Sequence, residues 1–576
     1  MLKHAKSHPK KRLDSLRSYS TLIRWFWQTG QSYRLQSLLN ILLGGLMVVA
    51  DLSFVWATKL AIDIATGADN RFTLSQAIAL IICLIIVQMT INISSRWVRA
   101  ILGVRAQNDM QQRLFNRLLK AQWRPLRKVH TGHLINRLER DVTDVVRFVT
   151  ESLPSLVTTL FQFTGAFLFL FWMDRTLACI VILVLPIFLL TSKLYMKRMR
   201  RITHDVRNTE SHLQTILQES LQHTLVIKTL GRIATMTQRL TSGQATLRSH
   251  VVRRTKYSTF SSGLMNFGFA TGYVLTFTWG VVHLQEGLIT YGSLIAFVQL
   301  VGQIQTPVRA LTQFIPVFIG AFTAAERIIE LQQIPLEEQL PDEQAPQPQT
   351  PSLGIVLSDI SYHYEKGARE IFRHFSYVFP PGSITAIQGE TGAGKTTLIR
   401  LLLALVSPNE GRVGLFAGES SASPADLCRS SQFQPITAAH RSYFSYVPQG
   451  NTLLSGTIRD NLLLGNPSAT EEEMCEALRT AAADFVFDLP DGLDTSLSEM
   501  GVGLSEGQAQ RISIARALLR PAPILLLDEA TSSLDAATER RVLQSIIQSH
   551  QGRTLLFVTH RPEVLRYCTQ TLELTK

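Results

Sequence analysis

The chain has 576 residues, of which 46% are hydrophobic and 18% are charged. One hydrophobic core rarely supports this length, and the composition is too apolar for a plain soluble enzyme and too charged for a protein buried wholly in a membrane. The sequence therefore predicts at least two domains, one in a membrane and one in water. The formal net charge of +13 would also suit a nucleic-acid-binding protein, so the positions of the basic residues have to decide between these classes.

Residues 1–17 are basic and polar, with no apolar run and no cleavage site of small residues. They predict a cytoplasmic N-terminus without a removable signal peptide. The cysteines are scattered, with no CxxC pair and no metal-ligand spacing, and we interpret them as structural thiols. They are Cys83, Cys179, Cys428, Cys475 and Cys568.

Six apolar segments precede residue 331, and each is long enough to cross a bilayer core, which needs about 20 residues. The second and third segments carry no charged residue. We predict six transmembrane helices, at Leu38–Thr58, Leu74–Ile93, Leu153–Met173, Thr176–Tyr195, Phe260–Leu284 and Leu288–Val308.

Lysine and arginine are concentrated in two long segments, one between spans two and three and one between spans four and five. The segments after spans one, three and five are short and contain, in turn, Lys59 with Arg71, Arg175 alone, and no basic residue. Because cytoplasmic segments carry the excess of Lys and Arg, we predict that the two long segments lie inside the cell. This arrangement accounts for much of the positive charge without nucleic acid.

Asp51 lies within the first predicted span, where burial of a carboxylate is costly. If the helix enters near Leu35, Asp51 lies about 24 Å along it. Two interpretations stay open: a structural or solvated residue near the outer mouth or a wet cavity, and a residue that contacts a transported substrate.

Residues 332–351 are rich in Pro, Gln and Glu and lack apolar periodicity, so they predict an extended linker. Beyond it, short apolar strands alternate with helices, which indicates an α/β domain. We therefore predict an all-α membrane domain over residues 1–331, a linker over 332–351 and an α/β domain over 352–576.

The sequence GETGAGKT fits the phosphate-binding pattern GxxxxGK[ST] and stands between a strand-like segment and a helix. Backbone N–H groups of such a loop face the phosphates of ATP, the lysine neutralises the β and γ groups, and the hydroxyl that follows binds Mg²⁺. The predicted nucleotide-binding residues are Gly389, Glu390, Thr391, Gly392, Ala393, Gly394, Lys395, Thr396 and Thr397, and Thr396 is also a predicted metal ligand.

A second phosphate-site element is predicted where the apolar strand Ile524–Leu527 runs into Asp528 and Glu529. Asp528 would hold the metal, directly or through a water. Glu529 would then stand beside the γ-phosphate, where it can orient and deprotonate the attacking water.

The segment LSEGQAQRISIARALL, just before this strand, resembles the signature of the ABC ATPases. The membrane domain resembles the exporter type of ABC transporter, whose long intracellular loops end in short coupling helices. Thr131–Val145 and Ser220–Arg232 occupy the places of these two helices. The resemblance covers essentially the whole chain and implies a P-loop NTPase fold for the α/β domain.

The resemblance assigns further residues in the order of the family. Tyr364 resembles the aromatic residue that stacks on adenine, Gln449 the glutamine that senses the γ-phosphate and binds the metal, and His560 the switch histidine. Glu499 matches an acidic residue of a loop that touches the coupling helices. Three signature residues and one from the loop after Glu529 would complete the site: Ser505, Gly507, Gln508 and Asp535.

The sequence departs from the family pattern in two places. Glu506 stands where the signature usually has a glycine, and it either points aside or weakens the site by repelling the phosphate. The stretch from Gly411 to Gln449 is longer than usual and poorly patterned.

We expect a half-transporter that hydrolyses ATP and moves a substrate across the plasma (inner) membrane, with the ATP-binding domain in the cytoplasm. The resemblance implies a dimer, homomeric or heteromeric, alternating access and outward transport. An ATP-gated channel and a soluble ABC ATPase acting on DNA or ribosomes are the alternatives. The six spans oppose the second of these, so no nucleic-acid partner is expected. An amphipathic small molecule, a lipid and a peptide all stay open as substrates.

Overall fold

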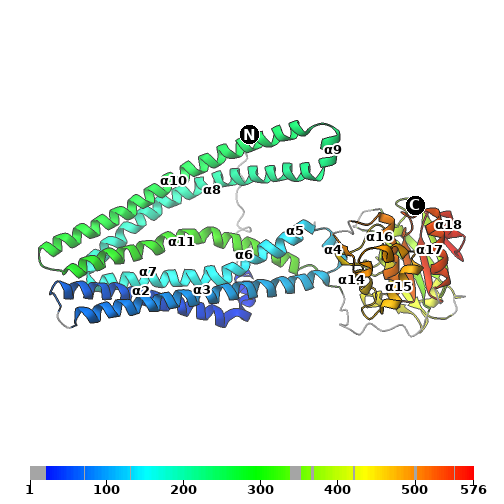
Figure 1. The fold of residues 1–576 in the computed structure, drawn as a ribbon, viewed down its shortest axis with the longest axis horizontal. Helices are drawn as coiled ribbons and strands as arrows, with labels where there is room; N and C mark the ends of the chain where they lie inside the picture. Colours follow the sequence, from blue (N-terminus) through cyan, green and yellow to red (C-terminus); the bar gives the residue numbers. More distant parts are fainter. Residues whose placement is uncertain are drawn as a thin grey trace. The chain divides into compact units, whose positions relative to one another are not determined.

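The computed structural model describes residues 21–69, 72–129, 131–337, 352–364, 369–418, 422–498, 503–549 and 552–575 (Figure 1). The chain forms two compact units. The helical unit comprises Met1–Phe115 and Gly132–Leu331, and the α/β unit comprises Asn116–Thr131 and Gln332–Lys576. The loop between the second and third spans therefore contributes residues to the α/β unit.

Long helices build the helical unit, and short helical segments connect them. The long helices are α2 (Arg34–Ala65), α3 (Leu74–Leu119), α7 (Leu153–Met173), α8 (Arg175–Gln222), α10 (Ile233–Gln285) and α11 (Tyr291–Gln332). The short segments are η1 (Gly30–Tyr33), α5 (Thr131–Asn136), η2 (Arg137–Asp141), α6 (Val142–Arg147), η3 (Phe148–Ser152) and α9 (Thr224–Thr229).

Five predicted spans lie wholly within five of these long helices, and the sixth begins three residues before α11. The difference has a local cause, because Gly287 turns the chain with a φ of 73° and the hydroxyl of Thr290 accepts a hydrogen bond from the Ser293 N–H. This capping contact starts the helix at Tyr291. Among the described residues, four helical segments are long and apolar enough to cross a membrane by length and composition.

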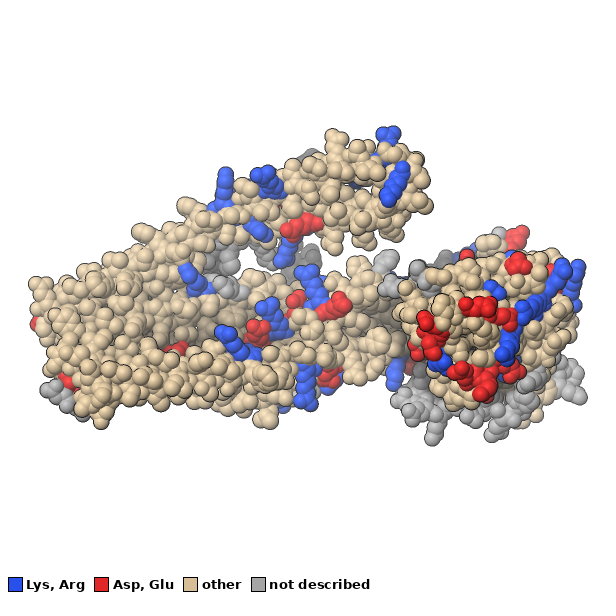
Figure 2. All heavy atoms as spheres, viewed as in Figure 1, with Lys and Arg blue, Asp and Glu red and all other residues tan. Residues whose placement is uncertain are grey.

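The helices α8 and α10 are far longer than a membrane is thick. They contain 48 and 53 residues, which correspond to about 72 and 80 Å against a bilayer core of about 30 Å. They run side by side and are joined by α9, which lies within the predicted second coupling helix (Figure 1). Figure 2 shows the lysines and arginines of this unit over one part of the helices, whereas the other part is almost uncharged.

The predicted first coupling helix, Thr131–Val145, begins at the boundary between the two units. Thr131 belongs to the α/β unit, whereas Gly132–Val145 belongs to the helical unit and leads toward α7, with Val142 and Val145 fully buried in its core. The first part, α5, has no buried residue, so core packing explains only the apolar residues near the end of the segment. The short helix that lies in the α/β unit is α4 (Trp123–Arg127), eight residues earlier.

Two main sheets form the α/β unit. A parallel sheet has the order β11-β3-β10-β9-β6, and an antiparallel sheet has the order β2-β1-β4-β5. The parallel strands are β3 (Ile384–Gly389), β6 (Phe444–Val447), β9 (Ile524–Asp528), β10 (Thr554–Val558) and β11 (Gln570–Leu574). The antiparallel strands are β1 (Gly354–Tyr362), β2 (Phe372–Phe379), β4 (Glu410–Phe416) and β5 (Gln434–Pro435).

Helices cover the sheets, and β7 (Gly456–Thr457) pairs with β8 (Ser496–Leu497). The remaining elements are α12 (Lys395–Leu402), α13 (Pro424–Leu427), η4 (Ala438–Tyr443), α14 (Ile458–Leu463), α15 (Glu471–Thr480), η5 (Asp484–Asp488), η6 (Gly492–Asp494), α16 (Glu506–Leu519), α17 (Ala536–Gln548) and α18 (Pro562–Leu565). The long stretch before Gln449 thus contains α13, β5 and η4. Every residue of β9 and β10 is buried, which fixes these two central strands in the core.

Candidate ATP site

Four neighbouring strands of the parallel sheet deliver the predicted site residues to one edge. The strands β3, β10, β9 and β6 are adjacent and parallel, so their carboxyl ends lie together. The phosphate loop follows β3, His560 follows β10, Asp528 ends β9 and Gln449 follows β6. This edge is where open α/β sheets place their ligands.

The phosphate loop has a backbone that requires glycine. Gly389, Gly392 and Gly394 have φ angles of 147°, 87° and 102°. A Cβ atom at Gly389 would lie 2.5 Å from the Leu574 carbonyl oxygen. The loop ends where α12 begins at Lys395, so the N-terminus of this helix provides N–H groups for an anion.

Lys395 is held at the edge of the sheet by polar contacts within the α/β unit. Its Nζ donates to the carbonyl oxygen of Gly389 at 2.5 Å and lies 2.8 Å from Nε2 of His560. Because an ammonium group has no acceptor, His560 receives this hydrogen bond on an unprotonated Nε2. An incoming phosphate would offer Lys395 a stronger partner than these neutral groups.

Glu529 stands at the centre of the converging side chains. One of its oxygens accepts from the Gln449 amide at 2.7 Å, and the other lies 4.0 Å from Nε2 of His560. The backbone of Glu529 has a φ of 49°, in the left-handed region that non-glycine residues rarely adopt. Its N–H donates to the Val558 carbonyl on the neighbouring strand, which holds this conformation. Strain of this kind gathers at functional sites.

Asp528 is buried, and burial raises the pKa of its carboxyl group. Tyr446 on β6 donates a hydrogen bond to it at 3.3 Å, and burial together with this carboxylate raises the pKa of the tyrosine. The predicted metal ligands Thr396, Gln449 and Asp528 offer a hydroxyl, an amide oxygen and a carboxylate, which are the oxygen donors that suit Mg²⁺. Among the described residues, no three His, Cys, Asp or Glu side chains form a metal cluster.

Tyr364, the predicted adenine contact, lies against the start of α12. Its hydroxyl is 3.2 Å from the Thr397 hydroxyl and accepts a hydrogen bond from Arg400 at 2.6 Å. The structure therefore brings Tyr364 to the phosphate loop. No signal in the sequence singled out Arg400, which fixes the tyrosine there.

The signature residues form the N-terminus of α16. Ser505 caps the helix by accepting from the Gln508 N–H, and the Gln508 side chain accepts in return from the Ser505 N–H at 2.8 Å. A Cβ atom at Gly507 would lie 2.9 Å from the Ser533 carbonyl, so this glycine allows close approach of the loop that precedes Asp535. Glu506 is exposed in the first turn, where the helix dipole favours an acidic residue.

Asp535 caps α17 by accepting from the N–H groups of Ala537 and Thr538 at 3.1 Å, and these hydrogen bonds lower the pKa of its carboxyl group. The predictions missed the side chains that hold the adjoining loop. Arg561 donates to the Leu534 carbonyl and to Glu539, which is 1% exposed. The position of Arg561 directly after His560 is the one sequence signal that could have indicated it. The predicted Glu499 lies outside the described residues.

Comparison with known proteins agrees with this geometry. The family model described as ABC transporter transmembrane region matches residues 37–308, and the one described as ABC transporter matches residues 372–532. A fatty acid ABC transporter ATP-binding/permease protein of Mycobacterium bovis is 31% identical over 442 residues, which cover 76% of this chain and 67% of that protein. The chain belongs to the ABC transporter family. It is a subunit of an ATP-driven transporter, with a transmembrane region fused to an ATP-binding domain.

Other relatives cover most of the transporter. An ATP-dependent lipid A-core flippase of Syntrophus aciditrophicus is 28% identical over 82% of this chain and 77% of its own length. A putative multidrug export ATP-binding/permease protein of Staphylococcus aureus is 27% identical over 85% of this chain and 83% of its own length. A solved structure of a bacterial Atm1-family ABC exporter with ATP bound has a TM-score of 0.76 at 23% identity, over 95% of this chain and 94% of that one, and shows the same fold.

The transporter places α4 beside the residues that hold Tyr364. The Trp123 ring lies between the guanidinium groups of Arg127, at 5.0 Å, and Arg400, at 4.7 Å, while Arg124 lies 5.7 Å from the Tyr364 ring. Arg400 is therefore shared between the loop of the transmembrane region and the predicted adenine contact.

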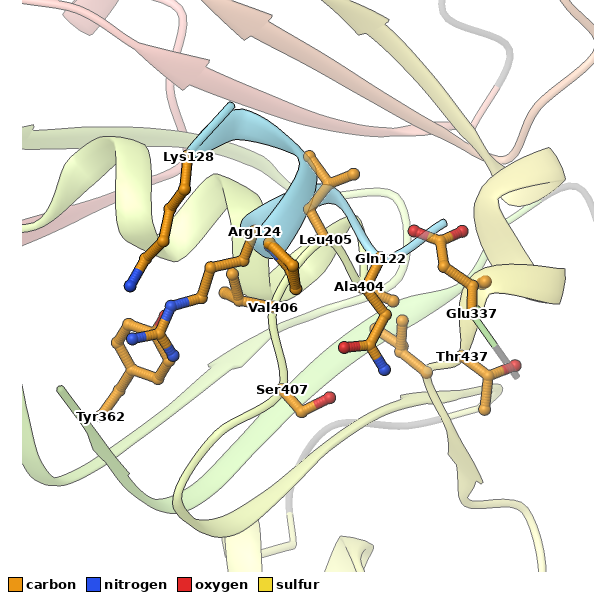
Figure 3. Close-up of a pocket in the computed structure, with 13 residues that line it drawn as sticks. Gln122, Arg124, Lys128, Glu337, Tyr362, Ala404, Leu405, Val406, Ser407 and Thr437 are labelled. Carbon is orange, nitrogen blue, oxygen red and sulfur yellow. The ribbon is translucent and has the colours of Figure 1, made fainter. Parts of the chain in front are cut away.

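A cavity of about 560 Å³ adjoins α4 within the α/β unit (Figure 3). Arg124 of α4 and Lys128, the residue after α4, line it, and Ser407 and Glu337 line other sides. Tyr362 also lines it, and its buried hydroxyl has no hydrogen-bond partner among the described residues. The junction between α4 and the rest of the unit is thus incompletely packed.

Proposed function

We propose that two such subunits form a dimer that binds ATP and Mg²⁺ at shared sites and exports an amphipathic molecule by alternating access. The observation that supports this most is the meeting of Lys395, Gln449, Glu529 and His560 at the carboxyl edge of one parallel sheet. The chain carries this ATPase site together with helices of membrane-spanning length.

In this proposal Lys395 and the N–H groups of the phosphate loop bind the β and γ phosphates. The metal is held by Thr396, Asp528 and Gln449, and it would neutralise charge that develops on the phosphate oxygens. Tyr364 stacks on the adenine, which requires that it exchange its present contacts with Thr397 and Arg400 for the base.

Glu529 is the proposed general base. Its carboxylate is oriented by the Gln449 amide, while His560 stands on its other side, close to Lys395. This arrangement suits a water in line with the γ-phosphate, because the base, the metal ligand and the phosphate-binding lysine come from adjacent strands. His560 would hold the γ-phosphate once Lys395 turns toward it.

Two features support a dimer. The signature residues Ser505, Gly507 and Gln508 sit on α16, and the resemblance to the family has them complete the ATP site of a second copy. In addition, α9 at the end of the long helices exposes apolar side chains: Leu225 is 76% exposed and Leu230 is 67% exposed. Large apolar side chains far from the membrane core indicate a surface that another protein covers, and the ATP-binding unit of the second copy is its proposed partner.

The relatives support an amphipathic substrate. They are described as acting on a lipid A core, on fatty acids or in multidrug export, and these molecules combine an apolar part with a polar one. The proposed direction is outward, as in the exporters that the chain resembles.

Reconstitution into sealed vesicles tests this function. Inverted vesicles that contain the wild-type protein should accumulate a fluorescent amphiphile above its external concentration when ATP and Mg²⁺ are added outside. The variant Lys395→Ala should accumulate none, because the β and γ phosphates lose their cationic partner. Equilibration of the probe without accumulation would instead indicate an ATP-gated channel.

A further inference from the structure

Asp51 is the only acidic residue in the six predicted membrane spans. The bilayer core penalises a carboxylate strongly, so a residue of this kind is retained where it has a partner or a task. Two buried acidic side chains elsewhere in the helical unit pair with a basic residue, Asp63 with Lys59 and Asp141 with Arg327. Asp51 therefore needs an explanation of its own.

Asp51 lies on α2 and is half-buried. One of its oxygens accepts a hydrogen bond from the Gln88 amide of α3 at 3.1 Å. Among the described residues this is its hydrogen-bond partner, and no lysine or arginine lies within ion-pair distance. A neutral amide leaves the negative charge uncompensated, so a cation would improve the site.

A cavity opens beside this carboxylate. It measures about 170 Å³ and lies between α2, α3 and α7. On α3, Asn92 and Ser95 line it at helical spacing from Gln88, and on α7 Gln162 lines it opposite. A second cavity of about 400 Å³ shares Asn92 and Met47 with the first. The carboxylate thus faces space that is both polar and reachable from a larger opening.

A basic residue of α3 also lines this cavity. It is Arg99, whose backbone lies eleven residues, and therefore about 16 Å along the helix, from that of Gln88. The Nε of Arg99 donates to the Ser95 carbonyl, which keeps its head at the cytoplasmic end. Leu43, Met47, Val48 and Ile91 contribute apolar wall, and Thr158 and Thr159 of α7 contribute hydroxyl groups. Negative charge, space and apolar surface therefore coincide at the level of Asp51.

We propose that Asp51 binds the charged head of an amphipathic organic cation, with Gln88 and Asn92 as polar neighbours and the hydrocarbon part against α2. This proposal rests on the proposed transport function and narrows its substrate class. The first cavity has room for a substituted ammonium group but not for a long chain, so the tail extends toward the second cavity. Met47 borders both cavities and can adapt to tails of different shape.

Two probes that share one alkyl chain and differ in head charge test the proposal. The full-length protein in lipid nanodiscs is titrated with decyltrimethylammonium and with decyl sulfate below their micellar concentrations, and ATP turnover is recorded. The cation should stimulate turnover of the wild-type protein at a concentration at least about tenfold lower than the anion, because only the cation gains a favourable interaction with Asp51.

The variant Asp51→Asn should keep the basal ATP turnover and raise the half-maximal concentration of the cation at least about tenfold, while the response to the anion stays unchanged. Asp51→Glu, which keeps the charge, should restore the cation response, and size-exclusion profiles confirm that both variants are folded. Equal responses of wild type to both probes, or a cation response of Asp51→Asn within twofold of wild type, would overturn the proposal. Absence of ATP turnover in the wild-type protein would instead count against the proposed function.

Discussion

Glu529 combines a strained backbone, an oriented carboxylate and a position beside the buried Asp528. Its φ of 49° is held by the hydrogen bond from its N–H to the Val558 carbonyl on β10. The pairing of β9 with β10 therefore stabilises the strained backbone. The Gln449 amide then fixes the side chain from β6. Each of these contacts comes from a different strand, so the position of the carboxylate depends on how these strands are arranged in the sheet.

Replacing Glu529 by glutamine should lower steady-state ATP turnover at least about a hundredfold, since a general base typically contributes about 10² to 10⁴ in rate. The affinity for ATP should survive, because Lys395 and Asp528 are unchanged. Phosphate release and nucleotide binding measure the two effects separately. Glu563→Gln is a matched control, because Glu563 forms ion pairs with Arg540 and Arg566 and not with the predicted site residues. Turnover of Glu529→Gln near the wild-type rate would show that another group is the base.

Replacement of Glu506, unlike that of Glu529, should not lower ATP turnover. It is exposed at the first position of α16, where its charge interacts well with the helix dipole but would approach a phosphate bound by the signature. Glu506→Gly should leave ATP turnover unchanged or raise it, while helix stability falls by about 1 kcal/mol or less. Turnover at saturating ATP and thermal unfolding measure these effects. A tenfold fall in turnover would make Glu506 a working part of the site.

At the scale of elements, α4 is the part that the sequence did not reveal. It has five residues, too few for any apolar period, and it follows an extended residue, Gln122, after α3 has ended at Leu119. Within the α/β unit the Trp123 ring packs on Arg400, a contact between segments far apart in the chain. The long helices, in contrast, were predictable because hydrophobic length alone specifies them.

Trp123→Ala should weaken the link between the transmembrane region and ATP binding. Arg400 would lose the ring on which it rests, and a cation–π contact of this kind is worth about 0.5 to 2 kcal/mol, so the KM for ATP should change about two- to thirtyfold. Stimulation of turnover by the transported probe should fall further than basal turnover. Trp172→Ala, which removes a tryptophan that is 77% exposed on α7, provides the matched control. Equal effects of both variants would deny α4 a specific role.

At the scale of the molecule, motif and fold constrain each other. The phosphate loop and Asp528 could be located from the sequence because each follows an apolar strand, whereas His560 was assigned from the resemblance to the family. Parallel strands bring their carboxyl ends to one edge of the sheet. The contacts of Tyr446 with Asp528 and of Arg561 with Glu539 could not, since they depend on strand order and on the packing of α17. The roles of the site residues stay predictions that kinetics has to test.

The dimer gives the last prediction, which concerns movement of the two ATP-binding units. If ATP joins the signature of one copy to the phosphate loop of the other, a site that binds ATP but cannot hydrolyse it should hold the units together. Glu529→Gln should therefore populate the closed dimer in ATP and Mg²⁺ without vanadate. A spin label at the exposed end of α17, introduced as Gln548→Cys after the native cysteines are replaced, reports the distance between the two copies.

The Glu529→Gln protein should show a single, shorter distance with ATP, whereas the wild type under turnover should show mostly the longer distance of the nucleotide-free state. Lys395→Ala is the control that should keep the longer distance in ATP, because its phosphate site is impaired. Addition of His560→Ala to Glu529→Gln should open part of the closed population, since the γ-phosphate loses one of its proposed contacts. A long distance in Glu529→Gln despite saturating ATP would mean that nucleotide binding does not close the pair, and the alternating-access proposal would then lose the step that drives it.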